Sequence, residues 1–215
     1  MRLHSLFERE REAINIIDAI KNGYLFDGEM YRIETEQDLF HCIQVMGYNV
    51  DPLGDGKFSY VYRGSRNEVV MKLSRTPAAY SEDKWWDWAK LSKEPARKNP
   101  MFPKMYYINA LKHEATGQPI GIAFLEYVHV NKDKLDDLAL EMGFSKFSEI
   151  IEEVQRRANN RLAESYNNLQ TYLKEFYIDI DDLISFIKNA QQFGFVDIHS
   201  GNVGYRKDGS FVIFD

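Results

Sequence analysis

Separate groups of residues in this chain have types and spacings that suit phosphate chemistry. The first is the stretch LGDGKFSYVY, in which Gly54 and Gly56 stand at a predicted turn between two strands. Glycine permits turn dihedrals that other residues avoid, and the N–H groups of such a turn can face the oxygens of a bulky anion. The second is Lys72, which interrupts the apolar stretch EVVMKLS and must direct its ammonium either to a sheet edge or to an anion.

Two further groups lie near the end of the sequence. Asp197, His199 and Asn202 share the loop VDIHSGN, where a carboxylate can deprotonate a hydroxyl and an amide oxygen can bind a hard cation. Asp215 ends the apolar stretch SFVIFD, where a carboxylate is costly unless it is solvated, paired or bound to a metal. Because Mg²⁺ combines one or two protein ligands with substrate phosphates, Asn202 and Asp215 would suffice. Each group alone also has an ordinary explanation, since Gly, Asp, Ser and Asn are common turn residues.

The elements that must position these groups follow from hydrophobic spacing. Helical spacing covers residues 3–22, and a second helix runs from the N-cap Thr35 to the stop at Gly47. Alternation predicts two strands within 53–75, with turns at 54–56 and 64–67. The elements expected after them are a helix over 78–93, two strands around Gly117, helices over about 132–142, 145–176 and 179–193, and a hairpin around Asp208-Gly209. This order predicts an α+β protein with a sheet lobe and a helical lobe.

Composition narrows the class of protein. The 215 residues carry 27 Lys and Arg against 33 Asp and Glu, a net charge of −6 that argues against direct nucleic-acid binding. The single cysteine, Cys42, excludes an internal disulfide and a thiolate metal site. No stretch has the apolar length of a signal peptide or a transmembrane helix, so we expect a cytoplasmic protein without a membrane partner.

Taken in order, the glycine turn, the strand lysine, the Asp…Asn loop and the strand-terminal Asp resemble the protein-kinase set. The intervals from Asp197 to Asn202 and from Asn202 to Asp215 are similar to those of the family's catalytic loop and metal-binding Asp. The stretch FLEYV sits at the position of the family's hinge, with Leu125 as gatekeeper and 126–128 facing adenine.

Within that superfamily, MGYNVDPLGDGKFSYVY and VDIHSGN are most similar to the early host-shutoff serine/threonine kinases of short-tailed bacteriophages. The resemblance implies a bilobal protein-kinase-like fold with a small β-rich N-lobe, a reduced helical C-lobe and extra N-terminal helices. The implied parts are a helical extension over 1–47, the N-lobe over 48–128 with the hinge at 126–128, and the C-lobe over 129–215.

The resemblance also implies residue roles. Asp197 would be the catalytic base, Asn202 and Asp215 would bind Mg²⁺, and Lys72 would pair with the phosphates of ATP. His199 stands where ordinary protein kinases place a phosphate-contacting Lys, and it is counted among the catalytic residues. The residues implied to contact the nucleotide are Gly54, Asp55, Gly56, Phe58, Ser59, Val61, Lys72, Glu126 and Val128.

Several features depart from the family pattern. Ser59 replaces the third glycine of the turn, and Phe195-Val196 replace the His-Arg before the catalytic Asp. The carboxylate partner of Lys72 stays open among Glu82, Asp83 and Asp87. The three tryptophans, Trp85, Trp86 and Trp88, are predicted to pack in the core rather than to form a ligand cage. The sequence stops at Asp215, which we interpret as either a minimal phage-type kinase or a fragment.

The main functional prediction is an ATP- and Mg²⁺-dependent serine/threonine protein kinase that phosphorylates bacterial host proteins and itself in the host cytoplasm. One alternative is a small-molecule phosphotransferase similar to aminoglycoside and choline kinases, which share the His-x-Gly-Asn loop pattern. Another is a catalytically dispensable kinase-like protein that binds and inhibits a host factor. Transfer of AMP instead of phosphate is a further possibility, for which the sequence offers no specific signal.

Overall fold

The structure is a computed structural model. It describes residues 3–48, 50–64, 69–92, 99–130, 132–157, 164–192, 194 and 198–214. The fold is α+β with antiparallel sheets, as the order of elements predicts. The chain packs as two compact units, the first made of Met1–Trp86 with Lys104–Tyr127 and the second of Asp87–Pro103 with Val128–Asp215.

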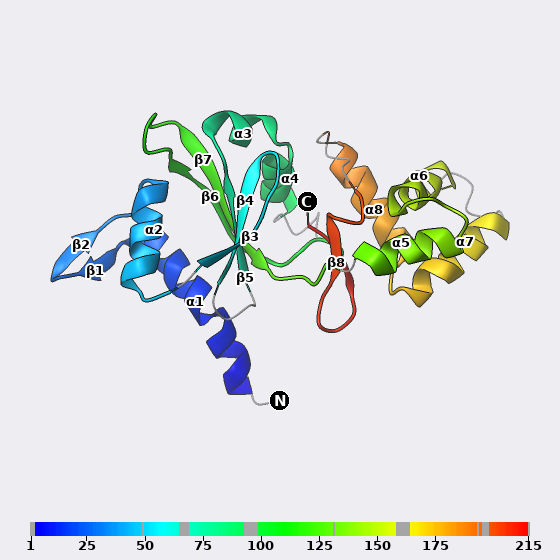
Figure 1. Cartoon of the computed structure of the whole chain (residues 1–215), viewed down its shortest axis with the longest axis horizontal. Helices are drawn as coiled ribbons and strands as arrows, with labels where there is room; N and C mark the ends of the chain where they lie inside the picture. The colour runs from blue at the N-terminus through cyan, green and yellow to red at the C-terminus, as the bar shows by residue number, and fades with distance from the viewer. Residues whose placement is uncertain are drawn as a thin grey trace. The chain divides into compact units, whose positions relative to one another are not determined.

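A five-stranded antiparallel sheet forms the centre of the first unit (Figure 1). In spatial order its strands are β3 (Val50–Asp55), β4 (Ser59–Gly64), β5 (Val69–Ser74), β7 (Pro119–Glu126) and β6 (Met105–Lys112). The middle strand, β5, is covered on both faces, and this explains why its sequence VVMKLS is nearly continuously apolar. Gly117, with a φ of 66°, lies in the predicted turn between β6 and β7.

The two strands predicted within 53–75 are confirmed as β4 and β5, but the sequence analysis missed a third strand. The additional strand, β3, begins at Val50 and continues through Gly54, with an irregular register between Pro52 and Gly54. β3 is an edge strand, where a proline costs no ladder hydrogen bond on the open side. Pro52 and Gly54 are therefore part of a strand, although these residue types are typical of a turn.

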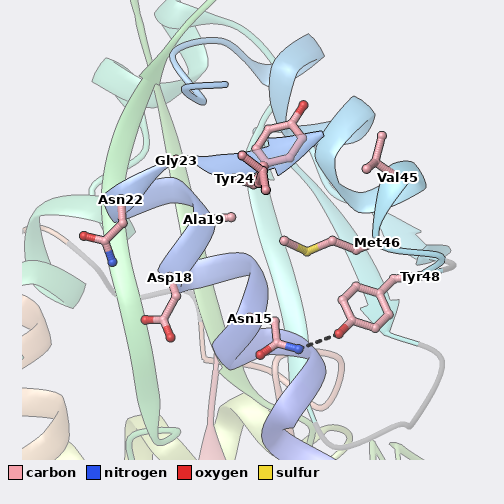
Figure 2. Close-up of a pocket in the computed structure, with 10 residues that line it drawn as sticks. Asn15, Asp18, Ala19, Asn22, Gly23, Tyr24, Val45, Met46 and Tyr48 are labelled. Atoms are coloured by element: carbon pink, nitrogen blue, oxygen red, sulfur yellow. Dashed lines mark hydrogen bonds between the residues drawn. The ribbon is translucent and has the colours of Figure 1, made fainter. Parts of the chain in front are cut away.

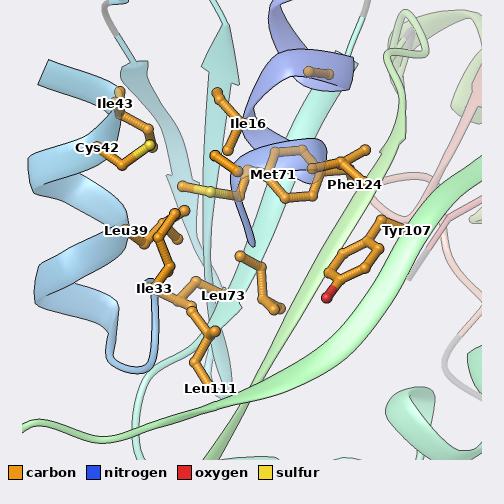
Figure 3. Close-up of a cluster of buried hydrophobic side chains, with 14 of the residues drawn as sticks. Ile16, Ile33, Leu39, Cys42, Ile43, Met71, Leu73, Tyr107, Leu111 and Phe124 are labelled. Carbon is orange, nitrogen blue, oxygen red and sulfur yellow. The ribbon is translucent and has the colours of Figure 1, made fainter. Parts of the chain in front are cut away.

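Two helices cover one face of this sheet. They are α1 (Leu3–Asn22) and α2 (Glu36–Val45), close to the predicted ranges. Thr35 caps α2 and forms a capping box with Asp38, and Gly47 follows the helix with a φ of 71°. Figure 3 shows the shared core between these helices and the strands. Its buried residues include Ile16, Ile17, Leu39, Cys42, Ile43, Met71, Leu73, Ile122 and Phe124.

On the opposite face of the sheet lies the first of two short helices, which replace the one continuous helix predicted over 78–93. α3 (Pro77–Glu82) and α4 (Trp85–Ser92) are separated at Asp83, whose φ of −76° and ψ of 104° are not helical. The Asp83 carboxylate accepts a hydrogen bond of 3.0 Å from the N–H of Trp85. Asp83 therefore ends one helix and caps the start of the next.

A small hairpin between α1 and α2 was not predicted from the sequence. Its strands are β1 (Tyr24–Phe26) and β2 (Glu29–Tyr31), joined by Asp27 and Gly28. Both turn residues have positive φ, 49° and 85°, as in the tight turns that suit hairpins. The Asp27-Gly28 pair is a hairpin signal that is visible in the sequence.

The second unit is mainly helical and also contains a short hairpin. Its helices are α5 (Lys132–Glu141), α6 (Phe147–Arg157), α7 (Glu164–Glu175) and α8 (Ile180–Gln191), and its strands are β8 (Val203–Tyr205) and β9 (Phe211–Ile213). The predicted helices over 132–142 and 179–193 and the hairpin are confirmed. The prediction over 145–176 matches α6 and α7, and 158–163 lie outside the described residues. Phe147 packs on Phe211 with ring centroids 5.9 Å apart. Among the described residues, no helix has the length and apolarity needed to cross a bilayer.

Candidate functional site

Lys72 lies in the middle of the first unit's sheet with its side chain buried. The residue is 3% exposed, and in the sheet register it lies opposite Val61 on β4 and Ala123 on β7. Paired residues share a face of the sheet, so Val61, Lys72 and Ala123 form a row across three strands. Met71 and Leu73 point to the other face, into the core shared with α1 and α2. The row therefore faces the α3–α4 side.

The ammonium of Lys72 has a carboxylate and an aromatic ring beside it. Its Nζ lies 3.9 Å from Oδ2 of Asp83 and 3.9 Å from the ring centroid of Trp85. Asp83, one of the three acidic candidates left open by the sequence, thus lies beside Lys72. The Asp83 side chain is 12% exposed and is held by its hydrogen bond to Trp85. A charge this deeply buried needs such partners, because desolvation would otherwise disfavour it strongly.

The prediction that the three tryptophans pack in the core is confirmed. Trp85 and Trp86 belong to the first unit, are fully or almost fully buried, and pack edge to face at 4.9 Å. Trp88 belongs to the second unit and packs on Phe102 and Phe186. The sequence did not reveal that one of these core rings, Trp85, also provides a surface for a cation.

The glycine turn is an open hairpin end whose geometry differs from the expectation. Neither Gly54 nor Gly56 has positive φ, so the idea that their dihedrals require glycine is wrong. A Cβ added to Gly54 would meet no atom within 4 Å, and one added to Gly56 would meet only the carbonyl oxygen of Ser59, at 3.7 Å. The backbone here is open to close approach from outside. The turn is closed by a hydrogen bond of 3.0 Å from the Gly56 N–H to the Ser59 carbonyl.

Arg75, which the sequence analysis missed, fixes this turn from the end of β5. Its Nε donates to the carbonyl of Gly56 at 2.8 Å, and its own N–H donates to the carbonyl of Phe58 at 2.9 Å. Its guanidinium also lies 4.4 Å from the ring centroid of Tyr60. A basic residue directly after a predicted strand was the available signal. Arg75 thus ties the glycine turn to the strand that carries Lys72.

Other predicted nucleotide contacts occupy defined places in the first unit. Asp55 is the last residue of β3 and lies opposite Tyr60 in the sheet register. Ser59 is 4% exposed, and its buried hydroxyl has no hydrogen-bond partner among the described residues. Leu125 is buried on β7, and Glu126 ends that strand, where its N–H and its carboxylate both bond the backbone of Lys104.

Val128 begins the second segment of the second unit and is followed by a backbone pairing to β8. His129 exchanges two hydrogen bonds of 2.9 Å with Tyr205. A Cβ on Gly204 would lie 2.7 Å from the His129 carbonyl oxygen, so only glycine allows this approach. Burial raises the pKa of the Tyr205 hydroxyl to about 12. His129 is in this way paired with β8, the strand that follows the His199–Asn202 loop.

The described part of the predicted catalytic loop is a tight turn. Nδ1 of His199 accepts a hydrogen bond of 3.0 Å from the Gly201 N–H, so a neutral imidazole carries its proton on Nε2. The Asn202 N–H donates to the His199 carbonyl at 2.9 Å. A Cβ on Gly201 would lie 2.8 Å from the His199 ring, which explains the glycine there. The predicted base, Asp197, lies outside the described residues.

Asn202 is joined to the far strand of the hairpin. Its carbonyl accepts a hydrogen bond of 3.0 Å from the N–H of Phe214, which extends the pairing of Val203 with Ile213 by one step. The structure thus brings the predicted ligand Asn202 beside the residue that precedes Asp215. Asp215 itself lies outside the described residues.

The Mg²⁺ site expected from Asn202 and Asp215 stays a prediction. Within the described ranges, no group of three or more His, Cys, Asp or Glu side chains could hold a metal ion. An amide and a carboxylate from Asn202 and Asp215 would be hard oxygen ligands that leave the remaining positions to water and phosphate. Neither protein-family models nor curated proteins gave a match to the chain.

Proposed function

We propose that this protein is an ATP- and Mg²⁺-dependent phosphotransferase with a bilobal protein-kinase-like fold. In this proposal it is a minimal phage-type serine/threonine kinase that acts on bacterial host proteins and on itself. The observation that carries the proposal is the buried Lys72 beside Asp83, on the same sheet as the open glycine hairpin. In protein kinases a glycine-rich loop covers the phosphates, and a lysine of the third strand pairs with a carboxylate of the following helix.

The sheet supports this assignment through its connectivity. β3 and β4 carry the glycine hairpin, β5 is the third strand of the sheet in chain order, and the α3–α4 corner with Asp83 follows it. One difference concerns the carboxylate, which comes from an Asp at a corner between two helices. Trp85 supplies the additional contact that holds the ammonium.

The residues would divide the work as follows. Lys72 would neutralise phosphate oxygens, while the N–H groups of the hairpin around Gly56 would face the phosphates. Asp197 would accept the proton of a Ser or Thr hydroxyl as its oxygen forms a bond to the γ-phosphorus and the bond to ADP breaks. Asn202 and Asp215 would hold Mg²⁺, which supplies charge neutralisation for the transferred group.

The test is transfer of label from γ-³²P-ATP in the presence of Mg²⁺ and host lysate. We expect labelled host proteins and labelled enzyme. Asp197→Ala should reduce the rate by several powers of ten because it removes the base. Asp137→Ala, which removes an exposed carboxylate on α5, is the matched control and should leave the rate unchanged.

The alternatives give different results in the same assay. Label on an aminoglycoside or on choline instead of on protein would favour the small-molecule phosphotransferase. ATP binding without transfer, together with a biological effect that survives Asp197→Ala, would favour the host-factor inhibitor. A folded protein that binds no ATP in a titration would refute the proposal.

A further inference from the structure

A groove of about 510 Å³ opens where α1 and α2 end and β1 begins. Figure 2 shows the residues that line it, with Asn15, Asp18 and Asn22 along α1 and with Met46 and Tyr48 after α2. Its lining residues Ala19 and Tyr24 belong to the core that lies on the Met71 face of the sheet. The groove is therefore on the other side of the sheet from Lys72. Its volume is within the range of small-molecule sites.

The groove has a negative electrostatic character. Asn22 and Gly23 mark the end of α1, while Val45 and Met46 mark the end of α2, so the carboxyl ends of two helix dipoles meet here. Asp18 adds a full negative charge, and the lining residues that the structure describes include no Lys or Arg. The nearest basic residue in the sequence, Lys21, has its Nζ 5.8 Å from the ring centroid of Tyr107 on β6. The field at the groove thus favours a cation.

The walls of the groove combine polar and apolar surface, and two of their side chains are held in place. The hydroxyl of Tyr48 accepts a hydrogen bond of 2.7 Å from Nδ2 of Asn15, which ties the ring to α1. The hydroxyl of Tyr24 lies 2.7 Å from Nδ1 of His41 on α2. The two rings and the Met46 side chain offer apolar surface to an aliphatic stem. Aromatic rings also attract cations, which adds to the effect of Asp18.

We propose that this groove binds an organic cation on an apolar stem, the chemistry of an arginine side chain or of a free alkylguanidine. The carboxylate and the helix ends would hold the charged head, while Tyr24, Met46 and Tyr48 would cover the stem. The inference does not rest on the proposed kinase activity, because no groove residue belongs to the predicted nucleotide site.

The experiment compares butylguanidinium with the neutral, nearly isosteric N-butylurea by calorimetric titration of the full chain. We expect saturable binding of the cation, at least about fivefold tighter than the urea, a difference of about 1 kcal/mol. Carbon-13 labelling of the methionine methyl groups locates the ligand, since the Met46 signal should shift while that of Met71 in the core should not.

Variants separate the site from general electrostatics. Asp18→Asn should weaken binding of the cation about threefold or more and leave the urea unaffected. Asn22→Lys should abolish cation binding, because it places a positive charge in the groove at an exposed helix end where lysine is well tolerated. Asp27→Asn is the matched control, since Asp27 is exposed, lies outside the groove lining and carries the same charge.

A short peptide with one arginine between alanines distinguishes the two sources of the cation. Binding of both the peptide and butylguanidinium would assign the groove to a basic segment of a partner protein, and binding of butylguanidinium alone would assign it to a free small molecule. Equal affinity for the cation and the urea, or an unchanged affinity in Asn22→Lys, would overturn the proposal. Circular dichroism confirms that each variant is folded.

Discussion

The contact between Lys72 and Trp85 can be measured by a double-mutant cycle on the free energy of unfolding. The single changes are Lys72→Met and Trp85→Leu. Methionine keeps an apolar stem of similar length without the charge, and leucine keeps an apolar side chain without the ring. The cycle needs no assumption about activity, because it measures only how strongly the two side chains interact.

The expected coupling follows from the geometry. Nζ of Lys72 lies 3.9 Å from the ring centroid of Trp85, and Trp85 is fully buried, so the contact is shielded from water. A shielded cation–π contact contributes about 2 kcal/mol. Trp85→Leu also leaves a cavity, which costs on the order of 3 kcal/mol whether or not Lys72 is charged. That term cancels in the cycle, so we expect a coupling energy of about 2 kcal/mol.

The single change Lys72→Met has its own expected value. It removes the cost of burying the ammonium, while Asp83 keeps its hydrogen bond from Trp85 and remains partly exposed. We therefore expect the free energy of unfolding to fall by no more than about 3 kcal/mol, because removing one partner of a buried ion pair is destabilising, and the relief of the ammonium from its desolvation cost offsets only part of that loss. The same variant should lose binding of ATP if the proposed function is right.

The assay is urea unfolding followed by far-ultraviolet circular dichroism, because fluorescence would change with the loss of Trp85. A coupling energy within about 0.5 kcal/mol of zero, the usual limit of additivity, would refute the claim that Trp85 holds the ammonium. A loss of more than about 3 kcal/mol in Lys72→Met would show instead that the lysine is a structural residue.

Three further predictions concern the first unit. Gly121→Ala should lower the free energy of unfolding by about 1–3 kcal/mol in urea titrations, because its Cβ would lie 2.6 Å from the Tyr80 ring and 2.7 Å from that of Trp86. Gly54→Ala is the control and should be nearly neutral, because its Cβ would meet no atom within 4 Å. Burial alone would raise the pKa of Asp38, but hydrogen bonds from Glu34 and Thr35 outweigh burial and lower that pKa. The Asp38 carboxylate should therefore stabilise the folded protein above the unfolded pKa of about 4, and this contribution should disappear as the pH falls through the lower folded pKa. Asp38→Ala should accordingly cost about 1 kcal/mol at neutral pH, with the difference from the parent shrinking in acid; a constant difference would contradict this. Burial raises the pKa of the Cys42 thiol to about 11, so the folded protein should not react with a thiol reagent at pH 8, and rapid reaction without urea would show that the core opens.

The sequence predicted elements best where the local signals are strong. Thr35 and Gly47 mark both ends of α2, and Gly117 marks the turn between β6 and β7. β3 was missed because edge position tolerates Pro52, and edge position is a property of the whole sheet. The break at Asp83 was missed because the helical spacing continues through it, while a side-chain hydrogen bond decides the local conformation.

In the candidate site too, the sequence indicates the types of residue but not their arrangement in space. The types of residue suggested that Lys72 needs a carboxylate, but the choice among three neighbours depends on where the chain bends. The role of Arg75 depends on the distance between its guanidinium and the Gly56 carbonyl, which no sequence spacing gives. The open groove between α1 and α2 depends on how the two helices end side by side, and no sequence motif predicts such a groove.

The packing of α1 and α2 on the sheet has a practical consequence for anyone who shortens this protein. A truncation that starts at residue 48 would strip one whole layer from the sheet and lay bare Met71, Leu73, Ile122 and Phe124. Such a product should self-associate or precipitate, since a large uncovered apolar surface drives aggregation. The first 47 residues therefore contribute a helical layer that the sheet needs, and expression trials should retain them.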